Sequence, residues 1–137
     1  MSCLYLIDAP STSAHPIYAS NLTINSPKYS RNCIQPNYYY EVVEVNVVSD
    51  GVYTLGSDNS ITIYGYLYKN KFNPLNPTEN QIDENSLSGC KKQFKLQKRT
   101  TYILVITTDW PNTIGSFSIM ALGPSNVTIK RSSEYSF

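Results

Sequence analysis

The sequence predicts an all-β protein, an antiparallel two-sheet sandwich of the jelly-roll or immunoglobulin-like kind with about eight strands. Three observations lead to this fold class. Tyrosine supplies 12 of the 137 residues and β-branched residues are abundant, which favours pleated, half-buried surfaces. Short apolar segments alternate or run between turn residues at the spacing of a sandwich or barrel. No segment shows the period of an amphipathic helix.

The strands of the first half follow from apolar alternation. The first regular strand is expected at 20–24, and a connection rich in Pro and Asn follows at 25–37. The next strand, 38–48, carries three valines on one face at period two, namely Val43, Val45 and Val47. The Ser-Asp-Gly sequence at 49–51 is a hairpin signal. We therefore expect strand 38–48 to pair antiparallel with a strand at 52–55.

The second half alternates in the same way. In the strand at 61–68, Ile61, Ile63 and Leu67 share one face and three tyrosines share the other. The segment 69–89 is rich in Asn and Pro and has no sustained period, which predicts a long loop. Apolar residues on both faces of 100–108 predict a central strand. Further strands are expected at 92–97, with Phe94 and Leu96 inward, at 115–121, with Phe117, Ile119 and Ala121 on one side, and at 126–130.

The length suits one domain with one core. We expect an N-terminal strand and linker at 1–17, the sandwich domain at 18–131 and a tail at 132–137. The formal net charge of +1 gives no electrostatic footprint for nucleic acid or an anionic membrane. No apolar run approaches the roughly 18 residues that span a bilayer. Neither nucleic acid binding nor membrane insertion is therefore expected.

The residue types that catalysis needs are scarce, so we expect no enzyme and no catalytic residue. The only histidine, His15, lies in a Pro- and Ser-rich stretch typical of a solvated loop. No phosphate loop, zinc-protease motif or Cys-x-x-Cys spacing occurs. Asp83 and Glu84 in the long loop are weak candidate calcium ligands, because two carboxylates are too few for a site. We therefore expect no cofactor and no metal, with calcium at these two residues as the weak alternative.

Two kinds of covalent feature are predicted. Cys3, Cys33 and Cys90 allow three single pairs or three free thiols, and our preference is a Cys33–Cys90 disulfide of roughly 3 to 4 kcal/mol. Asn21 and Asn126 each begin an Asn-x-Thr triplet, the acceptor sequence for N-linked sugar. These triplets indicate a secreted glycoprotein, extracellular or at the cell surface.

Two further segments suggest binding. Tyr64, Tyr66 and Tyr68 form a stripe, and Trp110 lies at a turn, so their rings are candidates for stacking on sugars. Packing of the stripe against the chain's own loops or a neighbouring subunit is the interpretation that we favour, because aromatic stripes on sheets usually pack. The second segment is strand-like and consists of Cys3, Leu4, Tyr5, Leu6 and Ile7. It is a candidate to add to a sheet edge of the next subunit, or else to fold back as an ordinary first strand.

Several strands together carry a resemblance to a known domain. They are 38–43 (YYYEVV), 51–55 (GVYTL), 63–68 (IYGYLY), 93–94 (QF), 102–108 (YILVITT) and 115–119 (GSFSI). Over roughly 20–129 the chain resembles a repeated extracellular β-domain found in tandem in large predicted surface proteins of small aquatic invertebrates. In strand order it is also similar to the bacterial pre-peptidase C-terminal (PPC-like) domain, a jelly-roll-like sandwich attached to secreted hydrolases.

That resemblance implies a non-catalytic module and, in many members, a calcium site. The strand acid of such a site is absent, since Thr62 and Ile63 stand there, and only Asp83 and Glu84 remain of its loop triplet. We expect an extracellular structural or adhesive module, the tandem repeat unit of a glycosylated surface or fibril protein, which self-associates through strand complementation. A carbohydrate-binding module and an accessory domain of a secreted hydrolase are the alternatives.

Overall fold

The computed structural model describes residues 17–31, 33, 35–57, 61–88 and 92–133. Within these ranges the chain forms antiparallel sheets and no α-helix, which confirms the predicted all-β class. The eleven strands are β1 (Tyr18–Leu22), β2 (Lys28–Tyr29), β3 (Tyr38–Tyr39), β4 (Glu41–Val47), β5 (Gly51–Gly56), β6 (Ile63–Lys69), β7 (Gln81–Ser86), β8 (Lys92–Leu96), β9 (Tyr102–Thr108), β10 (Gly115–Leu122) and β11 (Val127–Arg131). The expected number of about eight strands was wrong. Three strands escaped the sequence pattern, because β2 and β3 have only two residues each and β7 is polar.

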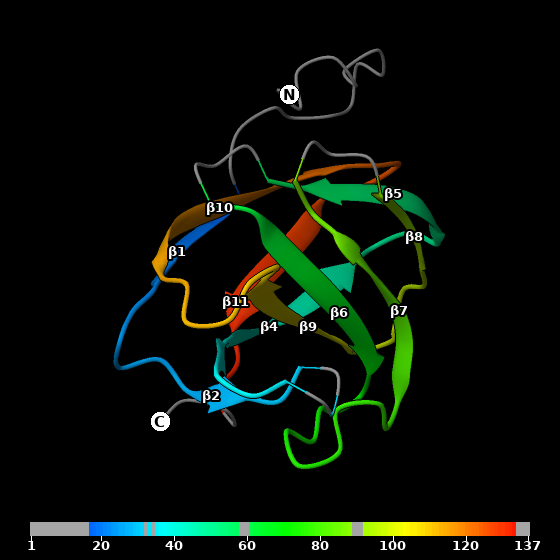
Figure 1. Cartoon of the computed structure of the whole chain (residues 1–137). Coiled ribbons are helices and arrows are strands. Elements are labelled where there is room, and N and C mark those ends of the chain that lie inside the picture. Colours follow the sequence, from blue (N-terminus) through cyan, green and yellow to red (C-terminus); the bar gives the residue numbers. More distant parts are fainter. Residues whose placement is uncertain (1–16, 32, 34, 58–60, 89–91, 134–137) are drawn as a thin grey trace.

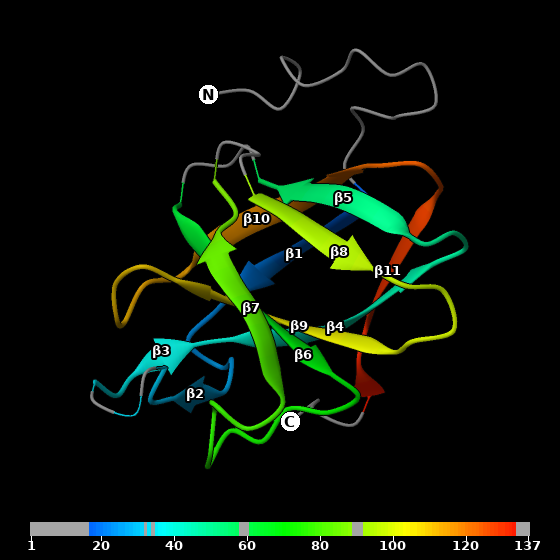
Figure 2. The same ribbon diagram turned by 90° about the vertical axis from the view of Figure 1, so that its right-hand side faces the viewer.

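Two sheets face each other to form the sandwich (Figures 1 and 2). The four-stranded sheet has the order β1-β10-β5-β8, and the five-stranded sheet has the order β11-β4-β9-β6-β7. Strand β9 lies in the middle of the larger sheet, and all of its residues are buried. The prediction of a central strand at 100–108 is thereby confirmed.

The core lies between the sheets and is mainly aliphatic. It contains the side chains whose alternation pointed to one face of each strand: Val43, Val45, Val47, Ile63, Leu67, Phe94, Leu96, Phe117 and Ile119. Strand residues alternate between the two faces of a sheet, so the period-two pattern identified the inward face of each strand. The first strand begins at Tyr18, two residues earlier than expected.

The predicted hairpin between 38–48 and 52–55 is wrong. Strand β4 pairs with β9 and β11, whereas β5 pairs with β10 and β8. The turn at 48–50 therefore carries the chain from one sheet to the other. Tyr53 supports this crossing, since its hydroxyl donates to the Ser49 carbonyl over 2.6 Å. The same residues of β4 and β5 face the core whether the two strands pair in one sheet or lie in opposite sheets. Alternation therefore could not distinguish these two arrangements.

A second buried layer covers the outer face of the five-stranded sheet. Its residues are Tyr29, Tyr38, Tyr40, Val42, Tyr66, Tyr68, Phe72, Ile103 and Val105, with Tyr64 packed against them. We call this set the tyrosine layer. The hairpin of β2 and β3 lies over it at the lower end of the molecule (Figure 2). The expected strand 38–48 is interrupted at Tyr40, whose N–H donates to the Pro27 carbonyl over 3.0 Å.

The long loop predicted at 69–89 is also corrected. Residues Gln81–Ser86 form β7, which pairs with β6 at the edge of the larger sheet. Strand β7 is polar because it lies at an edge of the sheet, where it has a neighbouring strand on one side only among the residues that the structure describes. Ile82 and Glu84 are accordingly exposed. A strand of this kind lacks the apolar alternation by which strands are recognised in a sequence.

Candidate functional site

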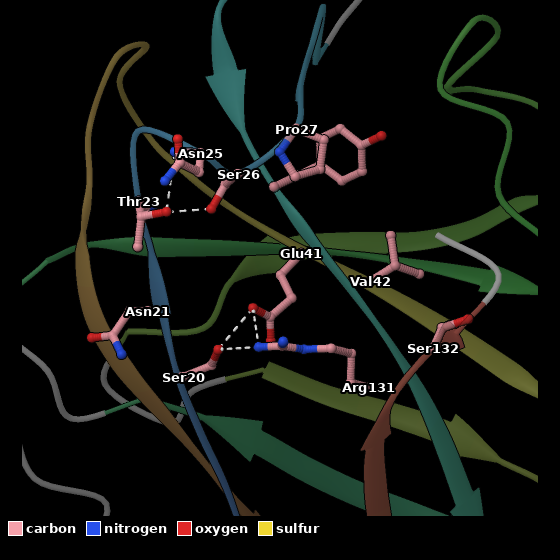
Figure 3. Close-up of a pocket in the computed structure, with 11 residues that line it drawn as sticks. Ser20, Asn21, Thr23, Asn25, Ser26, Pro27, Glu41, Val42, Arg131 and Ser132 are labelled. Atoms are coloured by element: carbon pink, nitrogen blue, oxygen red, sulfur yellow. Dashed lines mark hydrogen bonds and ion pairs between the residues drawn. The ribbon is translucent and has the colours of Figure 1, made fainter. Parts of the chain in front are cut away.

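A pocket of about 350 Å³ opens where β1 of the smaller sheet meets β4 and β11 of the larger one (Figure 3). Strand β1 supplies Ser20 and Asn21, and the turn that follows supplies Thr23, Asn25, Ser26 and Pro27. Tyr40, Glu41 and Val42 come from the start of β4, and Arg131 and Ser132 from the end of β11. We call this the edge pocket. Its residues lie far apart in sequence and meet only because edge strands of the two sheets lie side by side.

Four polar side chains connect the two sheets at the base of this pocket. Glu41 is the acceptor at the centre, and its side chain is 11% exposed. Its Oε1 accepts from Ser20 Oγ over 2.8 Å and from Arg131 Nη2 over 3.1 Å, and its Oε2 accepts from the Tyr18 hydroxyl. Arg131 Nη2 also donates to Ser20 Oγ over 2.8 Å. The carboxylate is therefore fixed in position by both sheets.

Burial of the Tyr18 ring and its hydrogen bond to Glu41 raise the pKa of Tyr18. The hydroxyl consequently stays protonated and donates to the carboxylate throughout the neutral range. Charged hydrogen bonds of this kind are stronger than neutral ones. The group of Tyr18, Ser20, Glu41 and Arg131, the edge tetrad, is thus a stable arrangement at physiological pH.

Backbone hydrogen bonds hold the walls of the pocket. In the turn after β1, Thr23 N–H donates to Ser26 Oγ over 2.9 Å and Asn25 N–H donates to Thr23 Oγ1 over 3.1 Å. On the opposite side, Ser132 N–H donates to the Val42 carbonyl over 3.0 Å. The polar groups of the pocket are therefore preorganised for a ligand, which reduces the entropy lost on binding.

The structure favours packing of the tyrosine stripe over stacking on sugars. Tyr66 is 5% exposed and Tyr68 is fully buried, so neither ring is available as a platform. The guanidinium of Arg31 lies over the rings of Tyr64 and Tyr66, at 4.5 and 5.8 Å from the ring centroids. Tyr66 and Tyr68 therefore pack within the chain, which is the interpretation favoured from the sequence. Trp110, 74% exposed in the turn after β9, stays a candidate for stacking.

Both predicted glycosylation sites are accessible. Asn21 and Thr23 are exposed at the end of β1, and Asn126 and Thr128 are exposed at the start of β11. In Figure 3 the Asn21 side chain points away from Glu41, because successive residues of a strand face opposite sides. Asn21 also lines the edge pocket, so a sugar on Asn21 would lie beside that pocket. Glycosylation at both asparagines stays a prediction.

Asp83 and Glu84 are neighbours on β7, so their carboxylates project from opposite faces of the strand. Glu84 N–H donates to Asp83 Oδ1 over 2.8 Å. Among the described residues, no group of three or more His, Cys, Asp or Glu side chains is placed to hold a metal ion. The geometry therefore gives the two weak calcium candidates no shared site.

The remaining predictions concern residues outside the described ranges. Cys33 is exposed, while its predicted partner Cys90 is not described, so the disulfide stays a prediction. His15 and the candidate intersubunit strand of Cys3, Leu4, Tyr5, Leu6 and Ile7 also lie outside. Within the described residues, no helix is long and apolar enough to cross a membrane.

Sequence reasoning did not find the edge pocket, although a signal for part of it was present. Glu41 stands between the buried residues Tyr40 and Val42, in a strand whose other polar residues are Glu44 and Asn46. A carboxylate in a buried strand needs an opposite charge or hydrogen-bond donors. That argument requires a partner for Glu41 but cannot choose Arg131, which lies 90 residues away.

No protein-family model, no curated protein and no solved structure matches the chain.

Proposed function

We propose that the chain is a non-catalytic adhesive module of a glycosylated extracellular protein. The observation that carries this proposal is the edge pocket, a preorganised polar site of about 350 Å³ on the open side of a rigid sandwich. Binding sites of small molecules combine such a concave shape with a few fixed polar groups. The resemblance to tandem extracellular β-domains is in line with the same function.

The chemistry of the pocket favours binding over catalysis. A general base must reach and accept a substrate proton, but both oxygens of Glu41 already accept hydrogen bonds from Tyr18, Ser20 and Arg131. The carboxylate is held as a fixed acceptor. The ion pair with Arg131 also balances its charge, so the site suits recognition of a neutral polar group.

The exposure of Asn21 and Asn126 supports the extracellular part of the proposal. Each acceptor lies on or beside an edge strand, β1 or β11, where attached sugar also hinders pairing with further strands. The molecule would therefore present its pocket to a ligand without joining other chains through β1 or β11.

Purification of the native protein from its source tests the proposal. Mass spectrometry of glycopeptides should find sugar on Asn21 or Asn126, and electron microscopy should show the chain in a surface layer or fibre. An unglycosylated monomer attached to a catalytic domain would contradict it and favour an accessory role in a hydrolase.

A second candidate function is a structural repeat unit assembled by strand complementation. It is favoured by the edges β7 and β8, which contain no predicted glycosylation site and which, among the described residues, pair with another strand on one side only. The added strand would come from Cys3, Leu4, Tyr5, Leu6 and Ile7 of a neighbouring copy.

Sedimentation of the full chain and of its Leu6→Pro variant tests this assembly. Proline removes one backbone donor and disfavours pairing, so oligomers of the parent chain should dissociate in the variant. A parent chain that stays monomeric at high concentration would rule out strand complementation.

A further inference from the structure

We infer that the edge pocket binds a neutral sugar ring, the terminal residue of a glycan on another molecule. The inference rests on the proposed adhesive function and names the ligand class of its site. The ligand chemistry follows from three properties of the pocket, which are its size, the division of its lining and its balance of charge.

The size favours a short ligand. About 350 Å³ is near the lower end of the roughly 300 to 1,000 Å³ typical of small-molecule pockets. The site is closed on one side by the turn after β1 and on the other by the end of β11 (Figure 3). A single ring with a short extension therefore fits better than a peptide strand or a long polymer.

The lining combines apolar and polar side chains. Pro27 and the almost fully buried Tyr40 and Val42 are apolar, and Ser20, Glu41 and Arg131 lie below Pro27 in Figure 3. A pyranose has the same division, with C–H groups on its faces and hydroxyl groups around its rim. Apolar contact with the ring faces and hydrogen bonds with the rim would bind it in one orientation.

The polar side contains both an acceptor and donors for sugar hydroxyls. Glu41 is an acceptor, and a carboxylate offers about four lone-pair sites, of which three are occupied here. Arg131 uses only Nη2 for its two bonds within the tetrad, and a guanidinium has five N–H donors. One carboxylate lone pair and further guanidinium donors are thus left for a ligand. Together they suit two adjacent hydroxyl groups of a sugar, one that donates to Glu41 and one that accepts from Arg131.

The charge of the pocket selects against ions. Glu41 and Arg131 are 3.1 Å apart, so a ligand anion near Arg131 would also meet the carboxylate. A ligand cation near Glu41 would meet the guanidinium in the same way. Repulsion from the second charge offsets attraction to the first, and a neutral hydroxyl pair is the ligand that both groups favour.

Solution NMR on the full-length ¹⁵N-labelled chain tests the inference. The probes are glucose, galactose, mannose, fucose and N-acetylglucosamine, each titrated into the millimolar range. At least one sugar should give saturable shifts of the amides of Ser26, Val42 and Arg131. The Arg131→Met variant should bind that sugar with an affinity about ten-fold lower or more, because charged hydrogen bonds to the ring are lost.

Lys130→Met is the matched control. Lys130 is the neighbouring cation on β11, but it pairs with Glu44 at 3.7 Å and does not line the pocket. It should leave sugar binding unchanged. The amide spectrum of each variant shows whether the fold is intact, so lost binding is not mistaken for unfolding.

Two outcomes would overturn the inference. One is that none of the five sugars shifts the pocket amides. The other is that shifts appear around Trp110 instead, which would move sugar binding to that exposed ring. In either case, sugar on Asn21 or Asn126 and a surface location in the native material would leave the proposed extracellular function standing.

Discussion

The core between the two sheets and the tyrosine layer outside the larger sheet are both closed to water, but different side chains close them. The inter-sheet core consists mainly of aliphatic residues contributed by both sheets. More than half of the residues of the tyrosine layer are tyrosines, whose rings carry hydroxyl groups and pack under a short hairpin and a loop. Aliphatic burial is stabilising wherever water is excluded. A buried hydroxyl is stabilising only when it finds a partner.

The tyrosines of the layer differ in this respect. The Tyr68 hydroxyl donates to the Pro77 carbonyl, and Tyr38 donates to Gln35 Oε1 over 3.2 Å. The Tyr29 hydroxyl is buried with no hydrogen-bond partner in the described structure, as is Nε of Arg31. The two faces of the larger sheet therefore differ. Burial alone stabilises the face in the inter-sheet core, whereas the stability of the tyrosine layer also depends on the protonation and hydrogen bonds of its hydroxyl groups.

The largest expected effect comes from alkaline pH, which acts on the tyrosine layer. Burial raises the pKa of Tyr66 to about 12, and burial also raises the pKa of Tyr29 and of Tyr68. The folded layer therefore keeps protons that the unfolded chain releases above its ordinary pKa of about 10. Stability is unaffected below that pH. Above it, each such tyrosine lowers the free energy of unfolding by about 1.4 kcal/mol per pH unit.

We expect cooperative unfolding between about pH 10 and about pH 12 as these losses add. Absorbance at the tyrosinate band, recorded with far-UV circular dichroism, measures it. Exposed tyrosines should ionise first, and the buried ones should ionise only as the sheet signal is lost. Ionisation of every tyrosine near pH 10 with the sheet signal intact would contradict a closed layer.

Removing one phenylalanine from each region gives the next largest effect. Phe117, between the sheets, is 1% exposed, and Phe72, in the tyrosine layer, is 3% exposed. Phe117→Ala should cost about 3 to 5 kcal/mol, because two sheets keep the cavity open. Phe72→Ala should cost about 2 to 3 kcal/mol, because Phe72 lies on a loop that can partly close the space. Urea unfolding compares them, and equal losses would show that the loop is as rigid as the sheets.

Deleting single hydroxyls separates satisfied from unsatisfied tyrosines, with smaller effects. Tyr68→Phe leaves the buried Pro77 carbonyl without its donor and should cost about 1 to 3 kcal/mol. Tyr29→Phe removes a hydroxyl that has no partner, so stability should stay the same or rise by up to about 1 kcal/mol. Thermal unfolding of both variants under one buffer condition measures the difference. A loss in Tyr29→Phe would indicate a bound water on that hydroxyl.

The smallest effect extends the comparison to the sandwich edge, where two glutamates of β4 form ion pairs. Glu41 pairs with Arg131 and its side chain is 11% exposed, while Glu44 pairs with Lys130 and is 31% exposed. Glu41→Gln should cost about 1 kcal/mol because hydrogen bonds to a charged acceptor weaken. Glu44→Gln should change stability by less than about 0.5 kcal/mol. Added salt should reduce only the second pair's contribution appreciably.

Alternation along the strands predicted the inward faces of the sandwich. Val43, Val45 and Val47 repeat at period two and lie in the inter-sheet core. When the two faces of a strand have different surroundings, apolar residues of the core face alternate with residues of the other face. The same pattern carries no information on which strand lies alongside. Strand β5 was therefore assigned to β4, although it pairs with β10 and β8.

The candidate site was less accessible to such reasoning. Ser20, Glu41 and Arg131 come from three strands, and they meet because β4 pairs with β11 and the smaller sheet places β1 beside them. The tyrosine stripe was found, but its exposure was not predictable. Whether Tyr66 and Tyr68 stack on a ligand or pack inside depends on Arg31 and Phe72, which reach them from other segments.

The position of β1 has a consequence for how the chain is made. Strand β1 leaves the ribosome well before its partner β10, and β4 likewise waits for β11. Neither pair can form until the strands between its two members have been synthesised. Distant pairings of this kind slow folding, and the unpaired strands of the nascent chain are open to aggregation in the meantime. Sugars added early at Asn21 would keep β1 soluble during that wait.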